Sequence, residues 1–364
     1  MPFPAEYGAK PYQFIPSPND NYTLASEGPL ARSSNAANEI TSICFDSSHE
    51  LFWTGNASGR VSGFTADAMK QIFSFNESRS YIQNLDVYDD IVITVTSNSV
   101  SGFQRSGHAF FRAHLPCFQD LKCIHRPSTN QNTVFIGGKQ NDLVIFDLES
   151  QTDVKIISDE NSSASQIRSN HSNIFCSNDK GVITIRSHNG EKLSEIQAHY
   201  GPITGFDICD NKLVTAGCTI KSGYNDPFGT PRGDPFLKVY DLRYMTAMQP
   251  ISTPFPPQHV FFADSLNTGK IVLTSHFGRV WTTNINNNSS THFIHELPIY
   301  SHIQHAALSS SHQTLAVVDN QQCGHIYSMY SPVRGCYGVV NYNSRSLTSS
   351  SYQPYDGYYD GMNS

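Results

Sequence analysis

Leu-Phe-Trp-Thr-Gly (51–55) is the first of seven short apolar runs that recur along the chain at nearly constant spacing. The starts of successive runs are separated by 40, 42, 40, 39, 58 and 44 residues. A period of about 40–45 residues built from strand-like units is typical of a β-propeller. The seven runs are 51–55, 91–96, 133–138, 173–178, 212–217, 270–275 and 314–319.

Each run is flanked by further strand patterns, so the units can be interpreted as blades of four strands, the seventh incomplete. Tight turns rich in Asn, Asp and Gly, such as 56–59 and 178–181, separate the second from the third strand, and these residues tolerate the positive φ of hairpin turns. Seven units in phase disfavour a β-sandwich or a stack of hairpins. The first strands are expected at 40–45, 82–87, 121–126, 165–170, 203–208, 259–264 and 303–308. The third strands are expected at 60–65, 99–104, 143–148, 182–187, 237–242, 279–284 and 325–330. We therefore predict an all-β fold, a seven-bladed β-propeller over residues 39–330.

Fourth strands follow in six of the units, and the seventh unit lacks one. Residues 12–15 (YQFI), in an otherwise irregular leader over 1–38, could supply it, and so could residues 337–342 (YGVVNY). We favour the N-terminal segment, because it joins the two ends of the ring and leaves no open sheet edge. Residues 331–364 are rich in Ser, Tyr, Asn and Gly with few aliphatic residues, and we expect this tail to be disordered.

One interval is longer than a hairpin turn requires. Residues 218–236 (CTIKSGYNDPFGTPRGDPF) predict a long projecting loop in the fifth unit. The mixture of aromatic and basic side chains suits a partner interface, and a tolerated surface insertion is the alternative. The candidate partner-binding residues are Lys221, Tyr224, Phe228, Arg232 and Phe236.

Composition limits the classes of function. The net charge is −7, which does not favour a general binder of phosphate backbones. A local RNA or acidic-partner contact at the basic residues of the fifth unit is the alternative to a solvated loop. No apolar run reaches the roughly 18 residues of a membrane helix, and the N-terminus lacks the apolar core of a signal peptide. The eight Cys are scattered in a chain without an export signal, which predicts buried free thiols.

The common catalytic and phosphate-binding motifs are absent from the sequence. Two His pairs, His292 with His295 and His302 with His305, suggest a metal site. An odd separation along a strand places the two side chains on opposite faces, which argues against joint ligation. We predict no metal, no cofactor and no catalytic residue. A propeller enzyme with a site at the mouth of the channel is an alternative, but the seven turns supply no ring of acids or His.

Some hallmarks of the WD-repeat class occur in altered form. Ala-His pairs end at His114 and His199, where that class has Gly-His before a first strand. Phe-Asp ending at Asp147, and Tyr240-Asp241, stand where that class has Trp-Asp at the end of a third strand. The resemblance implies that these residues fix the blades through hydrogen bonds, which is a structural role.

A closer resemblance covers residues 39–330. It is similar to the N-terminal WD-repeat region of the catalytic subunit of the poly(A)-specific nuclease (PAN) deadenylase family. The similar stretches are EITSICFD (39–46), LFWTG (51–55), AHYGPI (198–203), NKLVTAG (211–217) and, after the insertion, DPFLKVYDLRYM (234–245).

This resemblance implies a non-catalytic scaffold in cytoplasmic shortening of mRNA poly(A) tails, also in P-bodies. The implied partners are the pseudokinase adaptor subunit of the family's complex and poly(A) ribonucleoprotein. In that family a nuclease domain with a carboxylate cluster for two metals follows later, and residues 331–364 are too few to hold it. We therefore expect a fragment, a truncated product or a shortened relative that is not an enzyme. A generic WD-repeat adaptor outside RNA decay is the alternative.

Overall fold

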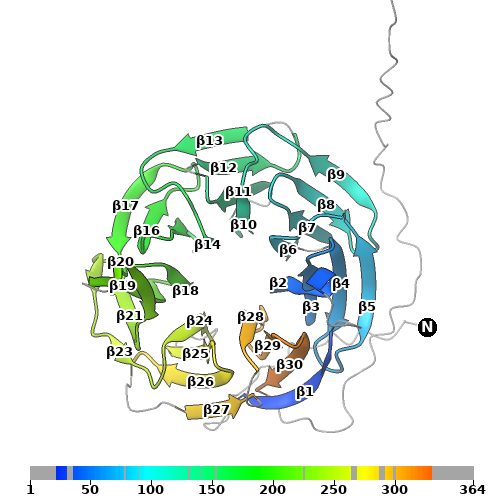
Figure 1. The fold of residues 1–364 in the computed structure, drawn as a ribbon. Coiled ribbons are helices and arrows are strands. Elements are labelled where there is room, and N and C mark those ends of the chain that lie inside the picture. The colour runs from blue at the N-terminus through cyan, green and yellow to red at the C-terminus, as the bar shows by residue number, and fades with distance from the viewer. Residues whose placement is uncertain are drawn as a thin grey trace, which may run out of the picture. The chain divides into compact units, whose positions relative to one another are not determined.

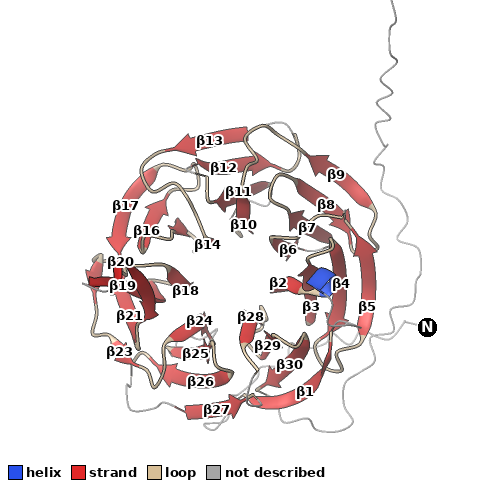
Figure 2. Ribbon diagram, viewed as in Figure 1, coloured by secondary structure: helices blue, strands red, loops and turns tan. Residues whose placement is uncertain are grey.

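The structure, a computed structural model, is almost entirely built from β-strands. A single-turn 3-10 helix, η1 (Ala36–Asn38), is the only helix in the part of the chain that it describes (Figure 2). The described residues are 22–30, 36–77, 79–88, 90–129, 132–140, 142–151, 154–223, 226–263, 269–286, 292–297 and 301–329.

Seven antiparallel sheets stand around a central channel, so the predicted seven-bladed propeller is confirmed (Figure 1). The first strand of each blade lies nearest the channel (Figure 1). In chain order the seven first strands are β2 (Ile40–Phe45), β6 (Asn84–Tyr88), β10 (Leu121–His125), β14 (Gln166–Ser169), β18 (Ile203–Cys209), β24 (Pro257–Phe262) and β28 (Ile303–Leu308). The second strands are β3 (Leu51–Asn56), β7 (Ile91–Val95), β11 (Thr133–Gly138), β15 (Ile174–Ser177), β19 (Lys212–Gly223), β25 (Lys270–Ser275) and β29 (Thr314–Asp319).

The third and outer strands complete each blade. The third strands are β4 (Arg60–Thr65), β8 (Val100–Gln104), β12 (Asp142–Asp147), β16 (Val182–Arg186), β21 (Phe236–Asp241), β26 (Arg279–Asn284) and β30 (Cys323–Ser328). The outer strands are β5 (Gln71–Asn76), β9 (Ala109–Ala113), β13 (Val154–Ser158), β17 (Lys192–Gln197), the short pieces β22 (Thr246–Ala247) and β23 (Ile251–Ser252), β27 (His292–Glu296), and β1 (Thr23–Pro29). Most observed bounds lie within two residues of the predicted ones.

The apolar runs form the second strands because both faces of these strands are covered by neighbouring blades. Every residue of β3 is buried, and Trp53 packs flat on Phe73 with ring centroids 5.3 Å apart. The first two blades share one core, in which Trp53 and Val61 meet Ile82 and residues of β6 to β8. Gly55 is needed at this junction, since a Cβ there would lie 2.7 Å from Ile82. Burial on both faces explains why these strands are continuous apolar runs instead of alternating ones.

The N-terminal segment closes the ring, but with different residues from those predicted. The outer strand of the seventh blade is β1, which pairs antiparallel with β30 from Thr23 opposite Ser328 to Pro29 opposite Cys323. The predicted closing strand at 12–15 and its rival at 337–342 both lie outside the described residues. The sequence of β1, TLASEGP, has little strand propensity, so pairing and the buried Tyr22 beside it hold this segment in place.

The predicted loop over 218–236 is instead a β-hairpin. β19 continues past the blade to Gly223 and pairs there with β20 (Asp226–Gly233). Gly and Pro residues suggested irregular structure, yet Pro231 lies in β20, which pairs only with β19 and so tolerates a missing N–H. The fifth blade therefore carries a two-stranded projection.

Candidate functional site

The hairpin places the candidate partner-binding residues along one projection. Arg232 is exposed and lies opposite Thr219 in the β19–β20 register, and Lys221 lies opposite Thr230. Phe236 begins β21 at the base of the hairpin with 45% of its surface exposed. Tyr224 lies outside the described residues, and the side chains of Lys221 and Phe228 do so too.

Further exposed apolar side chains, not predicted from the sequence, lie on the same face of the ring as this hairpin. Ile220 lies on β19, and its backbone N–H donates to the carbonyl of Tyr200 at 3.1 Å. Tyr200 is 71% exposed, and Phe277, in the corresponding turn of the next blade, is 68% exposed. In a four-stranded meander, the connections between second and third strands lie on the same face as those that enter first strands. This face of the fifth and sixth blades thus carries an apolar surface, which we call the hairpin face and define by Tyr200, Ile220, Phe236 and Phe277.

His199 anchors the root of the hairpin. It is fully buried, its Nδ1 lies 2.8 Å from Asp234 Oδ2, and its Nε2 is 3.0 Å from the Thr215 hydroxyl. The Thr219 hydroxyl donates to the other oxygen of Asp234 at 2.7 Å. Burial is the main reason that the pKa of His199 is below its ordinary value. These bonds connect the entry to the fifth blade with both ends of the hairpin, so the hairpin is held in one orientation.

The other predicted blade residues differ in environment. Asp147 accepts hydrogen bonds from the backbone N–H groups of Glu149 and Ser150, and so it stabilises the turn after β12. Asp241 accepts from the backbone and guanidinium of Arg243, and Tyr240 is buried in the core between the fourth and fifth blades.

His114 does not fix a blade, contrary to the prediction. It is exposed after β9. Phe118 is the buried residue of this connection and packs edge-on against Phe146, with ring centroids 6.0 Å apart. An aromatic side chain therefore occupies the place that a buried, hydrogen-bonded His was expected to hold. Asp234, the acid that pairs with His199, begins the family-like stretch 234–245, but no role for it was predicted from the sequence.

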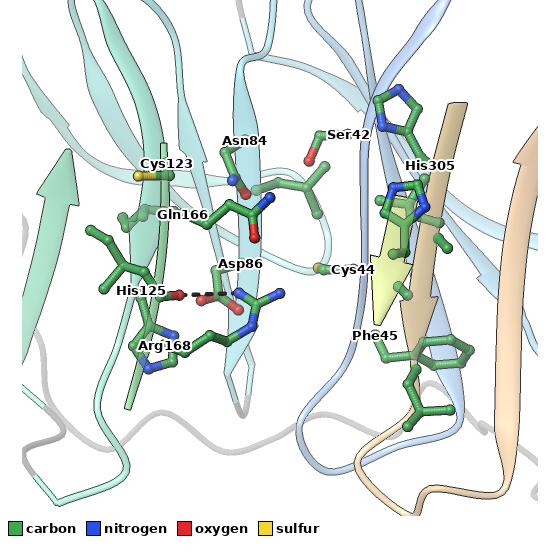
Figure 3. A pocket seen from close by; sticks show the side chains of 18 of the residues that line it. Ser42, Cys44, Phe45, Asn84, Asp86, Cys123, His125, Gln166, Arg168 and His305 are labelled. Carbon is green, nitrogen blue, oxygen red and sulfur yellow. Dashed lines mark hydrogen bonds between the residues drawn. The ribbon is translucent and has the colours of Figure 1, made fainter. Parts of the chain in front are cut away.

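The central channel holds a second group of polar residues. A cavity of about 580 Å³ is lined by residues from the first strands of all seven blades. Figure 3 shows Arg168 and Gln166 reaching from β14 into this space, with Asp86, His125 and His305 around it. Alternate residues of each first strand point to the channel because side chains alternate along a strand.

Burial shifts the protonation equilibria of these groups. Burial raises the pKa of Asp86 to about 6. The hydrogen bond from Tyr88 and the charge of Arg168 lower this pKa, but burial has the larger effect. Burial, together with Arg168, lowers the pKa of His125 to about 3. Burial also lowers the pKa of His259 to about 3, with smaller contributions from His305 and Arg168. The two imidazoles are therefore neutral at pH 7.

These histidines are poorly suited to catalysis. His125 Nε2 lies 2.7 Å from the Ser169 hydroxyl, a spacing that resembles a nucleophile with its base. Such a base needs an acid on its other nitrogen and a pKa near the working pH. No described acid bonds to His125, and its pKa is far too low. Among the described residues there is also no group of three or more His, Cys, Asp or Glu that could hold a metal ion.

The polar lining of the channel was not predicted, because it comes from the first strands and not from the turns. The signal lies in the first strands, where polar residues recur at every second position. Ser42 and Cys44 show it in β2, and Gln166 and Arg168 show it in β14. Of the pair His302 and His305, His305 lines the channel and donates from Nε2 to the Ile40 carbonyl.

Four-stranded blades stand in a ring around a channel, and β1 closes this ring by pairing with β30. This arrangement is that of a WD-repeat β-propeller. The WD40 domain of Pan2 from Neurospora crassa has the same fold, with a TM-score of 0.76 and 21% identity over 86% of this chain and 97% of that one. The chain belongs to the PAN2 N-terminal family, which matches residues 33–328.

Full-length relatives carry the same region. The chain is 26% identical over 244 residues to the PolyA-specific ribonuclease subunit panl-2 of Caenorhabditis elegans, covering 65% of this chain and 21% of that protein. It is 25% identical over 289 residues to the human PAN2-PAN3 deadenylation complex catalytic subunit PAN2, covering 78% of this chain and 23% of that protein. The chain thus spans under a quarter of the length of these relatives. Within the described residues, no helix has the length and apolar character to cross a membrane.

Proposed function

We propose that this chain is a non-catalytic scaffold of a PAN2-PAN3-type deadenylation complex. In this role it acts in shortening the poly(A) tails of mRNA in the cytoplasm, P-bodies included, without cutting RNA itself. The observation that carries the proposal is the family match over residues 33–328, a region that corresponds to the N-terminal WD40 part of the relatives.

The hairpin face supports a role in assembly. It exposes Tyr200, Ile220, Phe236 and Phe277 on one side of adjacent blades. Aromatic and apolar side chains of this kind are enriched at protein interfaces. The bonds of His199 and Asp234 hold the hairpin root rigid, so little ordering is needed when a partner binds. We propose the pseudokinase adaptor, PAN3, as the protein that binds this face, and poly(A) ribonucleoprotein as the further partner of the assembled complex.

A hairpin replacement tests this interface. Substituting Asn-Gly for residues 220–231 would join Thr219 to Arg232, which are opposite each other in the register, through a two-residue turn. Thr219 and Asp234 are retained, so the bonds around His199 should persist. We expect an unchanged melting temperature and binding to purified PAN3 of the same organism weakened by about tenfold or more, as is typical when interface anchors are removed.

Tyr244→Ala is the matched control. Tyr244 is 72% exposed in the same blade, in the turn after β21 on the opposite face. It should leave PAN3 binding unchanged. If the hairpin replacement binds PAN3 as tightly as the wild type does, the hairpin is a passive insertion and the proposed interface is wrong.

A further inference from the structure

Three polar side chains in the channel have hydrogen-bonding capacity that no other described residue uses. They are Ser42 on β2, Asn84 on β6 and Arg168 on β14, and all three line the same cavity. Figure 3 shows their side chains around one space, although β10 lies between β6 and β14 in the ring (Figure 1). The Ser42 hydroxyl and the Asn84 amide form no side-chain hydrogen bond within the described residues. Polar groups that line a cavity and have no hydrogen-bond partner there can bind a ligand.

Arg168 is the centre of this group. Its only described hydrogen bond is from Nη1 to the carbonyl of Ile167, at 3.1 Å, so Nε and Nη2 remain available. It forms no ion pair with a described carboxylate. Its charge nevertheless lowers the pKa values of Asp86, Asp207 and His125, which belong to three other blades. The guanidinium therefore acts on much of the channel while only its Nη1 is held, by the Ile167 carbonyl.

The two carboxylates of the channel are already satisfied by other donors. Asp86 accepts the Tyr88 hydroxyl at 2.6 Å and the backbone N–H of Val87 at 3.0 Å. Asp207 accepts the backbone N–H groups of Ile208 at 2.9 Å and Phe262 at 2.8 Å. Neither carboxylate needs the guanidinium as a hydrogen-bond donor, which leaves its planar donor edge for an added acceptor.

We propose that the channel binds a small molecule through a single oxyanion group, a phosphate or a carboxylate, held by Arg168 with Asn84 and Ser42. A planar guanidinium pairs with such groups through two parallel hydrogen bonds. The cavity of about 580 Å³ lies in the usual range of small-molecule sites, roughly 300–1,000 Å³. The imidazoles of His125 and His259 are neutral, and Lys122, which also lines the cavity, lies 4.0 Å from Asp179, so Arg168 is the main cation offered to an anionic group.

Titration calorimetry on the intact chain tests this site with three probes, inorganic phosphate, sulfate and acetate. We expect saturable binding of at least one of them, and the preferred probe distinguishes a phosphate ligand from a carboxylate ligand. Arg168→Gln should weaken that binding by about tenfold or more, because a charge-assisted hydrogen bond is lost. Asn84→Asp keeps the shape of the side chain and adds a negative charge, so it should also weaken binding.

Arg60→Gln is the control, since Arg60 is exposed on β4 and does not line the channel. It should bind the probe as the wild type does. Thermal unfolding of each variant confirms that it is folded. Binding that Arg168→Gln leaves unchanged would overturn the proposal, and so would no saturable binding of any probe to the folded wild type. In the second case Arg168 serves only to balance the charges of Asp86 and Asp207. None of these results depends on PAN3 binding, so the scaffold proposal is tested separately.

Discussion

Removing residues 1–30 should destabilise the ring severely, whereas removing residues 1–21 should have little effect. The longer deletion removes β1, which supplies the whole outer edge of the seventh blade, and it also removes Tyr22. Tyr22 is buried with Val272, Leu315 and Tyr327, and its hydroxyl donates to the His312 carbonyl at 2.6 Å. The shorter deletion retains every one of these contacts. The loss of β1 also leaves β30 as an open edge, which promotes aggregation.

Point substitutions at Tyr22 separate the contribution of its buried ring from that of its hydroxyl hydrogen bond. Tyr22→Ala should lower the free energy of unfolding by about 3–5 kcal/mol, the range for loss of a large buried aromatic side chain. Tyr22→Phe should cost only about 1 kcal/mol, the net contribution of one hydrogen bond. Denaturant unfolding followed by tryptophan fluorescence measures both. A deletion of 1–30 that unfolds at the same denaturant concentration as the wild type would show that β1 does not close the ring.

Asp159→Leu should be the most destabilising single substitution of a charged residue in the fourth blade. Arg186 on β16 is fully buried and donates from Nη1 and Nη2 to the two carboxylate oxygens of Asp159, at 2.7 and 2.6 Å. Without Asp159 the guanidinium keeps only its bond to the Gly190 carbonyl. An uncompensated buried charge costs about 3–5 kcal/mol. Thermal and denaturant unfolding measure the loss.

Two further variants distinguish the destabilisation caused by an unpaired buried charge from that caused by the loss of an ion pair. The double variant Asp159→Leu with Arg186→Met removes both charges and should recover most of the stability. Glu296→Gln breaks the exposed pair with Arg279 and should cost at most about 1 kcal/mol. If the double variant is as unstable as Asp159→Leu, the stranded charge is not the cause.

The same ion pair predicts a pH dependence. Hydrogen bonding from Arg186 is the main reason that the pKa of Asp159 in the folded protein is lower than its ordinary value. The resulting stabilisation is therefore present above the unfolded pKa of about 3.9 and is lost as the pH falls through the lower folded pKa. Asp159→Leu should accordingly lose less stability than the wild type does when the pH is lowered through this window.

The sequence predicted the ring well because each blade repeats the same physical requirement. A second strand covered on both faces must be a continuous apolar run, and the run that contains Trp53 and Gly55 shows this in its densest form. Closure was harder to predict, because TLASEGP becomes a strand only by pairing with β30, about 300 residues away in sequence. The strand propensity of the local sequence therefore predicts the buried second strands. It does not predict β1, which is a strand because of long-range pairing.

The sites were less predictable than the fold. The insertion of the fifth blade was recognised from its length, but Ile220 and Tyr200 became neighbours only through the hydrogen bonds of the folded hairpin. Arg168 and Asp86 are 82 residues apart in sequence and belong to different blades. The closed ring brings their strands, β14 and β6, to one channel. The spacing of the two residues in the sequence does not predict that they lie near each other.

The proposed scaffold role is tested most directly by purifying the tagged chain, expressed at its natural level, and measuring PAN3 and poly(A) RNA in the same eluate. The account predicts that PAN3 is among the most enriched proteins and that the hairpin replacement over residues 220–231 removes it, while Tyr244→Ala does not. Purification with an unrelated complex and no enrichment of PAN3 over an untagged control would contradict the account.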